Sequence, residues 1–345
     1  MNYRGILFFL GIYSLLVSLF SVLNIFYSIY FDFIIGLKSY IITFFISSTT
    51  GFSFYYIGRN HIKDISLIDQ IFFILLSFIL IPLLISIPYF FSIYNINLLN
   101  SYFESVSGFT TTGFSIFENI KNVDEPLILW RSSSQWIGGL LFLLATIGTI
   151  GSKQIKIKPS YLISGGASGR NFYNNFNYNF LNIFLIYFSL TIFVIFLYSL
   201  VDLRLLDAFN MSFTSISAGG FLPDDNLSNV LVNDLQIFIF SISLLIPIFN
   251  FFLLNDIITR KFSFRNYQED IHLGLLVLLI TLVFYFFVIS EEGFAKVFFA
   301  VTTSISTSGI SLYSSDLNLS LFFILLTIVG GSLISTSSGF KYTRI

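Results

Sequence analysis

Residues 105–114 read SVSGFTTTGF, and two later stretches of the chain repeat the pattern of this one. Residues 212–221 (SFTSISAGGF) and 301–310 (VTTSISTSGI) align with it without gaps when their glycines Gly113, Gly220 and Gly309 are superposed. In each copy a Ser or Thr stands six residues before that glycine, and Phe or Ile follows two residues later. Internal repeats set the architecture of a chain, so this threefold segment is the starting point for the fold.

A short apolar stretch leads into each copy, at residues 97–107, 204–214 and 293–303. Each stretch is about three helical turns long, which is roughly half the thickness of a membrane. The repeating unit is therefore a span, a half-helix, a glycine-bearing hairpin and a second span. A half-helix that ends inside the membrane directs its negative C-terminal end at the residues that follow.

The composition of the 345 residues places this unit in a lipid bilayer. Hydrophobic residues make up 55% of the chain and charged residues only 10%, against about 25% charged residues in soluble proteins. A net charge of −1 offers no basic field for nucleic acid. The absence of cysteine excludes thiolate metal sites and cysteine nucleophiles, and two histidines are too few for multi-histidine metal chemistry. We expect an all-α integral membrane protein with no cofactor, no nucleic-acid partner and no enzymatic activity.

Uncharged runs predict eight helices long enough to cross the bilayer. They lie near residues 5–30, 36–57, 70–93, 127–150, 178–200, 234–255, 271–290 and 319–338. Eight spans put both termini on the same side of the membrane. That side carries 12 of the Lys and Arg residues against five on the other, and the acidic residues divide five against 13. The positive-inside rule therefore predicts a multi-pass protein of the cell membrane with cytoplasmic termini.

The hairpins carry the residue types that a pore for a monovalent cation needs. Non-helical backbone at membrane depth occurs only where it is buried in protein or faces a water-filled path. Strands rich in Ser, Thr and Gly around one axis offer backbone carbonyls that replace the water shell of the cation. The alternative is that these small residues mediate close helix packing. Packing would account for a single such segment, but it accounts less well for three aligned copies.

Five stretches of the chain resemble the Trk-type potassium uptake proteins and the related Ktr and HKT transporters. They are Ser107–Ser115 (SGFTTTGFS), Leu129–Gly139 (LWRSSSQWIGG), Ser215–Phe221 (SISAGGF), Ser304–Ser311 (SISTSGIS) and Gly330–Lys341 (GGSLISTSSGFK). The first two together are specific, and all five follow the family order over nearly the whole chain. The resemblance implies the membrane subunit of a potassium uptake system, built from span–pore-loop–span repeats around one selectivity filter.

The resemblance divides the chain into two leading transmembrane helices, residues 1–66, and three pore repeats. The repeats occupy residues 67–158, 159–262 and 263–345, with the second helix of the third repeat cut short. A fourth repeat, which the family carries, has no counterpart before Ile345. Three alternatives stay open: a separate chain supplies it, the sequence is a truncated product, or subunits complete one another.

By this resemblance, the selectivity filter coordinates K⁺ through the backbone carbonyls of three equivalent strands. The filter positions are Thr110, Thr111, Thr112, Gly113, Ser217, Ala218, Gly219, Gly220, Ser306, Thr307, Ser308 and Gly309. In the HKT branch, Ser in place of the first filter glycine goes with sodium preference. Glycine in all three strands therefore favours potassium. A sodium-conducting relative and a truncated, non-conducting membrane scaffold are the alternatives.

In the family, the second helix of the third repeat is broken by small residues that form a gating loop beneath the filter. The positions that fit this loop are Gly330, Gly331, Ser332, Ser335, Thr336, Ser337, Ser338 and Gly339. A helix with this many Gly and Ser residues unwinds at low cost. Tight packing against a neighbouring helix is the alternative interpretation. Lys341, beyond the loop, is equally consistent with a place at the cytoplasmic exit and with positive-inside anchoring.

Arg131 stands beside Trp130 at the outer start of the fourth predicted span. We favour interfacial anchoring for this pair, because Trp and Arg commonly anchor helix ends. Pairing of Arg131 with Glu104 or Glu118 around the pore is the alternative.

The sequence contains no Walker motif and no dinucleotide fingerprint, so the chain itself is not expected to bind nucleotide. The resemblance implies a homodimer and a cytosolic nucleotide-binding regulatory ring, which would dock on residues 153–177 and 256–269. Coupling of K⁺ uptake to Na⁺ or H⁺, as in symport, stays open because no midplane carboxylate marks a proton relay.

Overall fold

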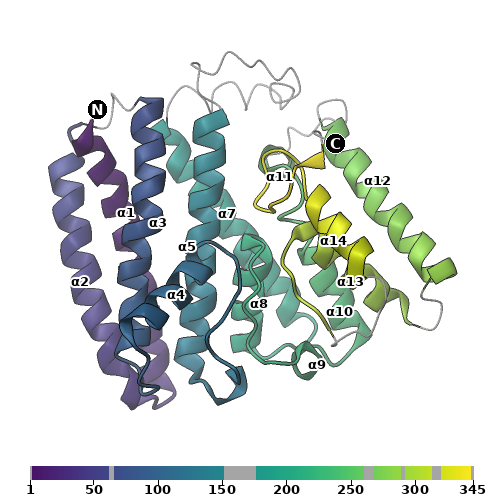
Figure 1. Ribbon diagram of the computed structural model, residues 1–345, viewed down its shortest axis with the longest axis horizontal. Helices are drawn as coiled ribbons and strands as arrows, with labels where there is room; N and C mark the ends of the chain where they lie inside the picture. Colours follow the sequence, from purple (N-terminus) through teal and green to yellow (C-terminus); the bar gives the residue numbers. More distant parts are fainter. Residues whose placement is uncertain are drawn as a thin grey trace. The chain divides into compact units, whose positions relative to one another are not determined.

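The computed structural model describes residues 2–61, 66–150, 176–259, 267–288, 292–312 and 320–342, which are helical and contain no strand (Figure 1). The chain forms two compact units, Met1–Gln154 and Ile155–Ile345. The all-α class predicted from the sequence is confirmed over these ranges.

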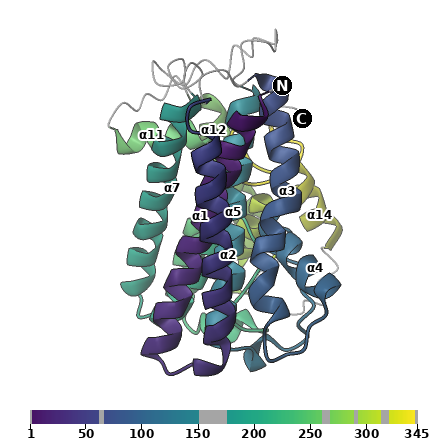
Figure 2. The same cartoon turned by 90° about the vertical axis from the view of Figure 1, so that its left-hand side faces the viewer.

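The first unit contains the two leading helices and the first repeat. Its helices are α1 (Tyr3–Tyr30), α2 (Ile34–Gly58), α3 (Leu67–Phe90), α4 (Leu98–Phe109) and α5 (Glu125–Ile150), with a 3-10 turn η2 (Ile120–Asn122) before α5. Helix α1 packs along α2, α3 and α5 (Figure 2), and α4 contacts both α3 and α5. With 12 residues, α4 is the half-length helix that the sequence predicts between two spans.

Glycine allows the close approach of the two leading helices. A Cβ atom at Gly58 would lie 2.4 Å from the carbonyl oxygen of Arg4, and one at Gly11 would lie 2.7 Å from the amide nitrogen of Tyr55. Small residues that let two backbones meet are the usual device of helix pairs in membranes. The α1–α2 pair is thus a tight hairpin against which the first repeat packs.

The second unit contains two further copies of the repeat. Its helices are α7 (Phe176–Ser199), α8 (Leu205–Ser217), α9 (Leu227–Val230), α10 (Asp234–Ser243), α11 (Phe251–Ile258), α12 (Gln268–Val283), α13 (Phe294–Ser306) and α14 (Ser320–Val329), and a π-helical turn η4 (Phe284–Val288) continues α12. Helices α8 and α13 have 13 residues each and are the counterparts of α4. Apolar side chains of α12, α13 and α14 form one core with Ile248.

Within the described ranges, five helices are long and apolar enough to cross a membrane. They are Tyr3–Tyr30, Ile68–Phe90, Glu125–Ile147, Phe180–Ser199 and Gln268–Val288. Helix α2 has 25 residues, enough for a span, but its sequence is rich in Ser and Thr. The predicted sixth span is interrupted by a break, and the predicted eighth span ends early.

The predicted continuous helix over residues 234–255 is wrong. It is interrupted between α10 and α11, over residues 244–250, which we call the 244–250 break. Pro247 lies in this segment, and proline has no N–H to continue a helical hydrogen-bond ladder. The predicted eighth helix, 319–338, also ends early, because α14 stops at Val329 and residues 330–342 are irregular.

Candidate functional site

The three predicted filter segments share a left-handed residue at the same aligned position. We call them hairpin 1 (residues 107–114), hairpin 2 (214–221) and hairpin 3 (303–310). In each hairpin, the residue two positions before the aligned glycine has a left-handed backbone. The φ angles are 55° at Thr111, 55° at Ala218 and 61° at Thr307. Residues with side chains disfavour this region by about 1–2 kcal/mol. The same deviation at three aligned positions therefore indicates a structure that the surroundings impose.

A side-chain hydroxyl closes each hairpin in the same way. The Ser or Thr that stands six residues before the aligned glycine donates a hydrogen bond to the carbonyl seven residues later, just after that glycine. The three bonds run from Ser107 Oγ to Phe114 O (2.5 Å), from Thr214 Oγ1 to Phe221 O (2.6 Å) and from Thr303 Oγ1 to Ile310 O (2.8 Å). This bond explains the hydroxyl residue that the aligned copies have in common. It fixes the outgoing strand against the last turn of the half-helix.

The glycines of the hairpins are not equivalent. Gly113 and Gly309 have φ of 85° and 68°, in the left-handed region that glycine enters without steric cost. Gly220 has no such positive φ. The backbone angle at the last position therefore favours glycine in hairpins 1 and 3. At Gly309 a Cβ atom would meet nothing within 4 Å, so the backbone angle, not space, requires glycine there.

A buried ion pair fixes the outgoing strand of hairpin 1. Glu104 on α4 accepts from Arg131 Nε on α5 at 2.9 Å, from Ser115 Oγ at 3.0 Å and from the Ile116 amide at 2.8 Å. Arg131 Nη2 also donates to Ser115 Oγ at 2.9 Å. The exposed fractions of the two charged side chains are 1% and 0%. The favoured interpretation of Arg131 as an interfacial anchor is therefore wrong, and its pairing with Glu104 is the arrangement found.

Other residues of the 129–139 stretch join α5 to its neighbours. Trp130 Nε1 donates to the carbonyl of Ile85 on α3 at 3.0 Å. A Cβ atom at Gly138 would lie 1.8 Å from the carbonyl oxygen of Phe109, the last residue of α4. Gly138 therefore lets α5 pass directly against the start of hairpin 1. Sequence reasoning did not assign Gly138 a role, although the Gly-Gly pair within a predicted span was a signal.

In the second unit, the predicted gating loop lies against the ends of two half-helices. We call residues 330–339 the 330–339 loop. Thr336 Oγ1 donates to the carbonyl of Ile216 on α8 at 3.1 Å. The amide and the hydroxyl of Ser338 each donate to Thr307 Oγ1 of hairpin 3 at 2.9 Å. The structure thus brings this loop together with the regions of hairpins 2 and 3.

The 330–339 loop also interlocks with the 244–250 break. Ser332 N donates to Ile248 O at 2.8 Å, and Ser337 N donates to Pro247 O at 3.0 Å. In the opposite direction, Phe251 N donates to Ile334 O at 2.7 Å. Each broken helix thereby supplies partners for backbone groups that the other leaves outside a helical ladder, as buried backbone requires.

Close packing explains the glycines of the 330–339 loop. A Cβ atom at Gly330 would lie 2.1 Å from Ser338 O, and one at Gly331 would lie 2.5 Å from Ile248 O. Gly330 and Gly339 also have φ of 66° and 93°. The loop folds back on itself at these residues, and Figure 1 shows it beyond α14. The unwound segment is therefore present, and its glycines pack closely within the loop and against the 244–250 break.

Two acidic residues at the start of α12 bind the backbone of the 244–250 break and of the 330–339 loop. Asp270 Oδ1 accepts from the Asn250 amide at 2.7 Å, and Glu269 Oε1 accepts from the Leu333 amide at 3.0 Å. Sequence reasoning gave these acids no role beyond the charge count. Two adjacent carboxylates at the start of a predicted span were the signal that could have found them.

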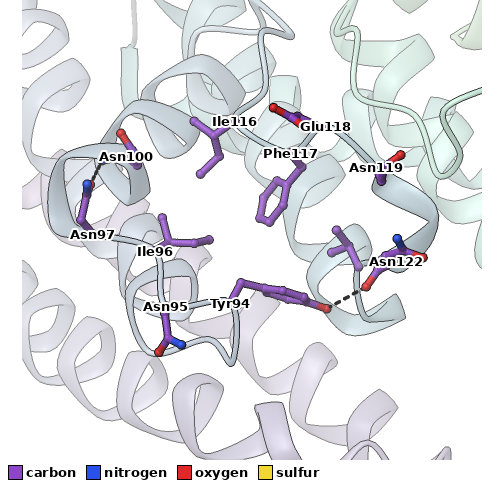
Figure 3. Close-up of a pocket in the computed structure, with 11 residues that line it drawn as sticks. Tyr94, Asn95, Ile96, Asn97, Asn100, Ile116, Phe117, Glu118, Asn119 and Asn122 are labelled. Atoms are coloured by element: carbon purple, nitrogen blue, oxygen red, sulfur yellow. Dashed lines mark hydrogen bonds between the residues drawn. The ribbon is translucent and has the colours of Figure 1, made fainter.

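A polar pocket of about 430 Å³ lies in the first unit beside the segment that follows hairpin 1 (Figure 3). Its wall includes Tyr94, Glu118 and several asparagines. Tyr94 Oη donates to Asn122 O at 3.3 Å and accepts from the Asp124 amide at 2.7 Å. Burial raises the pKa of Tyr94 to about 12. Among the residues described, no three His, Asp or Glu side chains gather as metal ligands.

Sequence comparison finds relatives among cation transporters, although no protein-family model matches the chain. An uncharacterised cation transporter of Methanocaldococcus jannaschii is 27% identical over 283 residues, which are 76% of this chain and 54% of that protein. The Trk system potassium uptake protein TrkI of Halomonas elongata is 27% identical over 296 residues, 78% of this chain and 55% of that protein. TrkH of Salmonella typhimurium is 23% identical over 320 residues, 88% and 66% of the two chains.

A solved structure matches the fold over the full length of the chain. The potassium transporter TrkH from Vibrio parahaemolyticus superposes with a TM-score of 0.80 and 22% sequence identity, covering 100% of this chain and 74% of its own. The resemblance to Trk-type potassium uptake proteins is thus confirmed at low identity. The chain spans about half the length of the first two of these relatives.

Proposed function

We propose that this chain, which resembles the Trk-type potassium uptake proteins, is a pore subunit that admits K⁺ across the cell membrane. The proposal rests on the conformation shared by hairpins 1, 2 and 3. Three hairpins with the same left-handed residue and the same hydroxyl closure, each at the end of a half-length helix, are more than packing of small residues requires. The potassium uptake proteins among its relatives support the choice of ion.

In this proposal, K⁺ loses its water shell to backbone carbonyls of residues 110–113, 217–220 and 306–309. Helices α4, α8 and α13 end at these segments and direct the negative ends of their dipoles toward them. The hydroxyl closures keep the strands from relaxing around a smaller ion. Glycine at the last position of each strand favours K⁺ over Na⁺ by the resemblance to the HKT branch.

The 330–339 loop is the proposed gate beneath the filter. Its contacts with the α8 end and with Thr307 support this role, because a loop held there obstructs a path that continues below hairpins 2 and 3. These contacts run through the hydroxyls of Thr336, Ser338 and Thr307. Hydroxyl hydrogen bonds contribute only about 1 kcal/mol each, so they can be broken and remade when the loop moves.

Partners belong to the same proposal. Three hairpins leave a fourfold path one strand short, so we propose that the conducting assembly includes a fourth span–hairpin–span unit, from a separate chain or from further sequence. We also propose a homodimer, cytoplasmic termini, and a cytosolic nucleotide-binding ring docked on residues 153–177 and 256–269. Residues 153–175 and 260–266 of those loops lie outside the described ranges.

Ion flux in liposomes tests the proposal. The chain is reconstituted alone and together with a candidate fourth unit, and the fluxes of ⁸⁶Rb⁺ and ²²Na⁺ are compared. We expect flux that favours Rb⁺, and we expect Gly113→Ser to reduce this preference while the protein still inserts. Gly36→Ser is the matched control, because a Cβ atom at Gly36 would make only an ordinary contact, 3.7 Å from the Tyr40 ring.

The possible results separate the alternatives. Equal or greater Na⁺ flux in the unmodified chain would favour a sodium-conducting relative. No flux of either ion, with every candidate partner present, would favour a non-conducting scaffold. An unchanged permeability ratio in Gly113→Ser would contradict the assignment of the filter.

A further inference from the structure

Lys341, just beyond the 330–339 loop, is turned back into that loop. Its exposed fraction is only 9%, although lysine is among the residues most often found in water. Its backbone φ is 72°, in the left-handed region that side-chain-bearing residues disfavour. Such a conformation persists only where the surroundings hold it. Simple anchoring by the positive-inside rule needs neither feature.

The ammonium group of Lys341 is surrounded by oxygen atoms of the loop. Nζ donates to Ser335 Oγ at 3.0 Å, to Ser335 O at 3.4 Å and to Ser337 O. A lysine ammonium has three donors, and two carbonyls with one hydroxyl supply three acceptors. We call Ser335 O, Ser335 Oγ and Ser337 O the oxygen cage.

The oxygen cage is itself fixed by neighbouring groups. Ser335 Oγ donates to Ser332 O at 2.7 Å and lies 3.0 Å from Ser337 Oγ. Ser337 N is bonded to Pro247 O in the 244–250 break. The oxygens therefore converge because the loop and the break hold them, and this arrangement does not depend only on the lysine.

Neutral carbonyl and hydroxyl oxygens on a fixed loop are the ligands that proteins use for dehydrated monovalent cations. An ammonium is a compact point charge, so the same oxygens can coordinate it or a dehydrated monovalent cation. A buried charge is tolerated only when it is hydrogen-bonded or paired, which explains the convergence of several oxygens on Nζ.

We infer that Ser335 and Ser337 form a monovalent-cation site that the ammonium of Lys341 occupies, and that this tethered cation holds the 330–339 loop closed. The inference deepens the proposed function, because it names what keeps the proposed gate shut. While Nζ fills the oxygen cage, the loop stays bonded to Ile216 and Thr307. When the ammonium leaves, the cage either takes up K⁺ or loses the charge that organises it.

Thiol modification tests the inference without any need for ion flux. The chain contains no cysteine, so Ser337→Cys introduces a single thiol, at a side chain that is fully buried in the closed loop. In membrane vesicles, a charged methanethiosulfonate reagent should modify this thiol slowly. Adding Lys341→Met, which keeps the apolar stem and removes the ammonium, should raise the rate in choline buffer about tenfold or more, as loss of a charged hydrogen bond predicts.

Potassium then distinguishes a cation site from a merely structural lysine. In the Lys341→Met background, K⁺ at equal ionic strength should slow the modification again, whereas in the background with Lys341 it should have no effect. Lys296→Met is the matched control, because the ammonium of Lys296 pairs with Glu292 at 2.8 Å and this ion pair does not involve the 330–339 loop. This control should leave the modification rate of the introduced thiol unchanged in both buffers.

Each remaining result overturns the inference. A slow rate in Lys341→Met would show that the ammonium does not hold the loop closed. A fast rate that K⁺ fails to slow would show a structural lysine with no cation site. The thiol assay measures closure of the loop and not transport. Absence of ion flux in liposomes would therefore contradict the proposed function, but the modification rates would still test the role of Lys341.

Discussion

Arg131 and Glu104 form an ion pair with Nε and Oε1 at 2.9 Å, and their side chains are 1% and 0% exposed. The pair joins α5 to α4, and Glu104 also holds Ser115 and the Ile116 amide. The aligned positions in hairpins 2 and 3 are Met211 and Ala300, which cannot form such a pair. Hairpins 2 and 3 therefore cannot repeat this ion pair at the aligned position.

Removing one partner of this pair should be costly, because it leaves the other charge buried. We expect Arg131→Met to lower the free energy of unfolding by about 3–5 kcal/mol. Thermal unfolding of the purified protein in detergent measures the effect. The double variant Glu104→Gln/Arg131→Met should recover part of the loss. Additive losses in this double-mutant cycle would show that the two residues do not interact.

Gly138 should tolerate no side chain. In Gly138→Ala the new Cβ atom would lie 1.8 Å from Phe109 O, so α4 or α5 must move at the start of hairpin 1. We expect a loss of about 1–3 kcal/mol in stability, together with a weaker Rb⁺ over Na⁺ preference in liposomes. Gly36→Ala is the control and should change neither property. A fully stable Gly138→Ala protein would contradict the direct contact of α5 with Phe109 O.

The hydroxyl closure of hairpin 2 should matter more for selectivity than for stability. Thr214→Val keeps the shape of the side chain and removes the bond from Oγ1 to Phe221 O, which is 2.6 Å long. We expect a stability loss of about 1 kcal/mol and a clear fall in the Rb⁺/Na⁺ flux ratio. Thr191→Val is the matched control, because Thr191 is also buried and its hydroxyl donates within α7 to Tyr187 O at 2.8 Å. Equal flux ratios in the two variants would argue against a role for the closure.

Asp270 should act as a hydrogen-bond acceptor at the 244–250 break. Asp270→Asn keeps an oxygen for the Asn250 amide, which now lies 2.7 Å from Oδ1, and should be tolerated. Asp270→Leu leaves that amide without its acceptor, and we expect a loss of about 1–3 kcal/mol. Unfolding in detergent separates the two variants. If Asn is as damaging as Leu, the charge of Asp270 and not its acceptor oxygen is what the break requires.

The outline of the fold could be read from local sequence. Composition required a membrane, and the aligned Ser/Thr–Gly segments after half-length apolar stretches predicted α4, α8 and α13. The uncharged run by itself predicted a helix up to residue 338, and only the family resemblance implied the interruption that follows Val329. The hydrophobic period, the length of an apolar stretch and helix-breaking residues are properties of a few turns of chain. Neighbouring residues therefore decide where these helices form.

The 244–250 break shows where local reasoning fails. Pro82 and Pro88 both lie inside the continuous helix α3, whereas Pro247 lies in a break. Proline alone therefore does not decide whether a helix is interrupted. The 244–250 segment stays unwound because the 330–339 loop and Asp270 supply partners for its backbone groups. Those partners lie far away along the chain.

The class of protein, the repeat and the half-length helices follow from local sequence, since hydrophobicity and backbone propensity belong to each segment. Tertiary structure decided which partner Arg131 takes, why Gly138 must be glycine, and where the ammonium of Lys341 lies. These depend on which distant atoms come within a few ångströms of one another. A buried charge or a close backbone contact has meaning only once the neighbouring segment is in place.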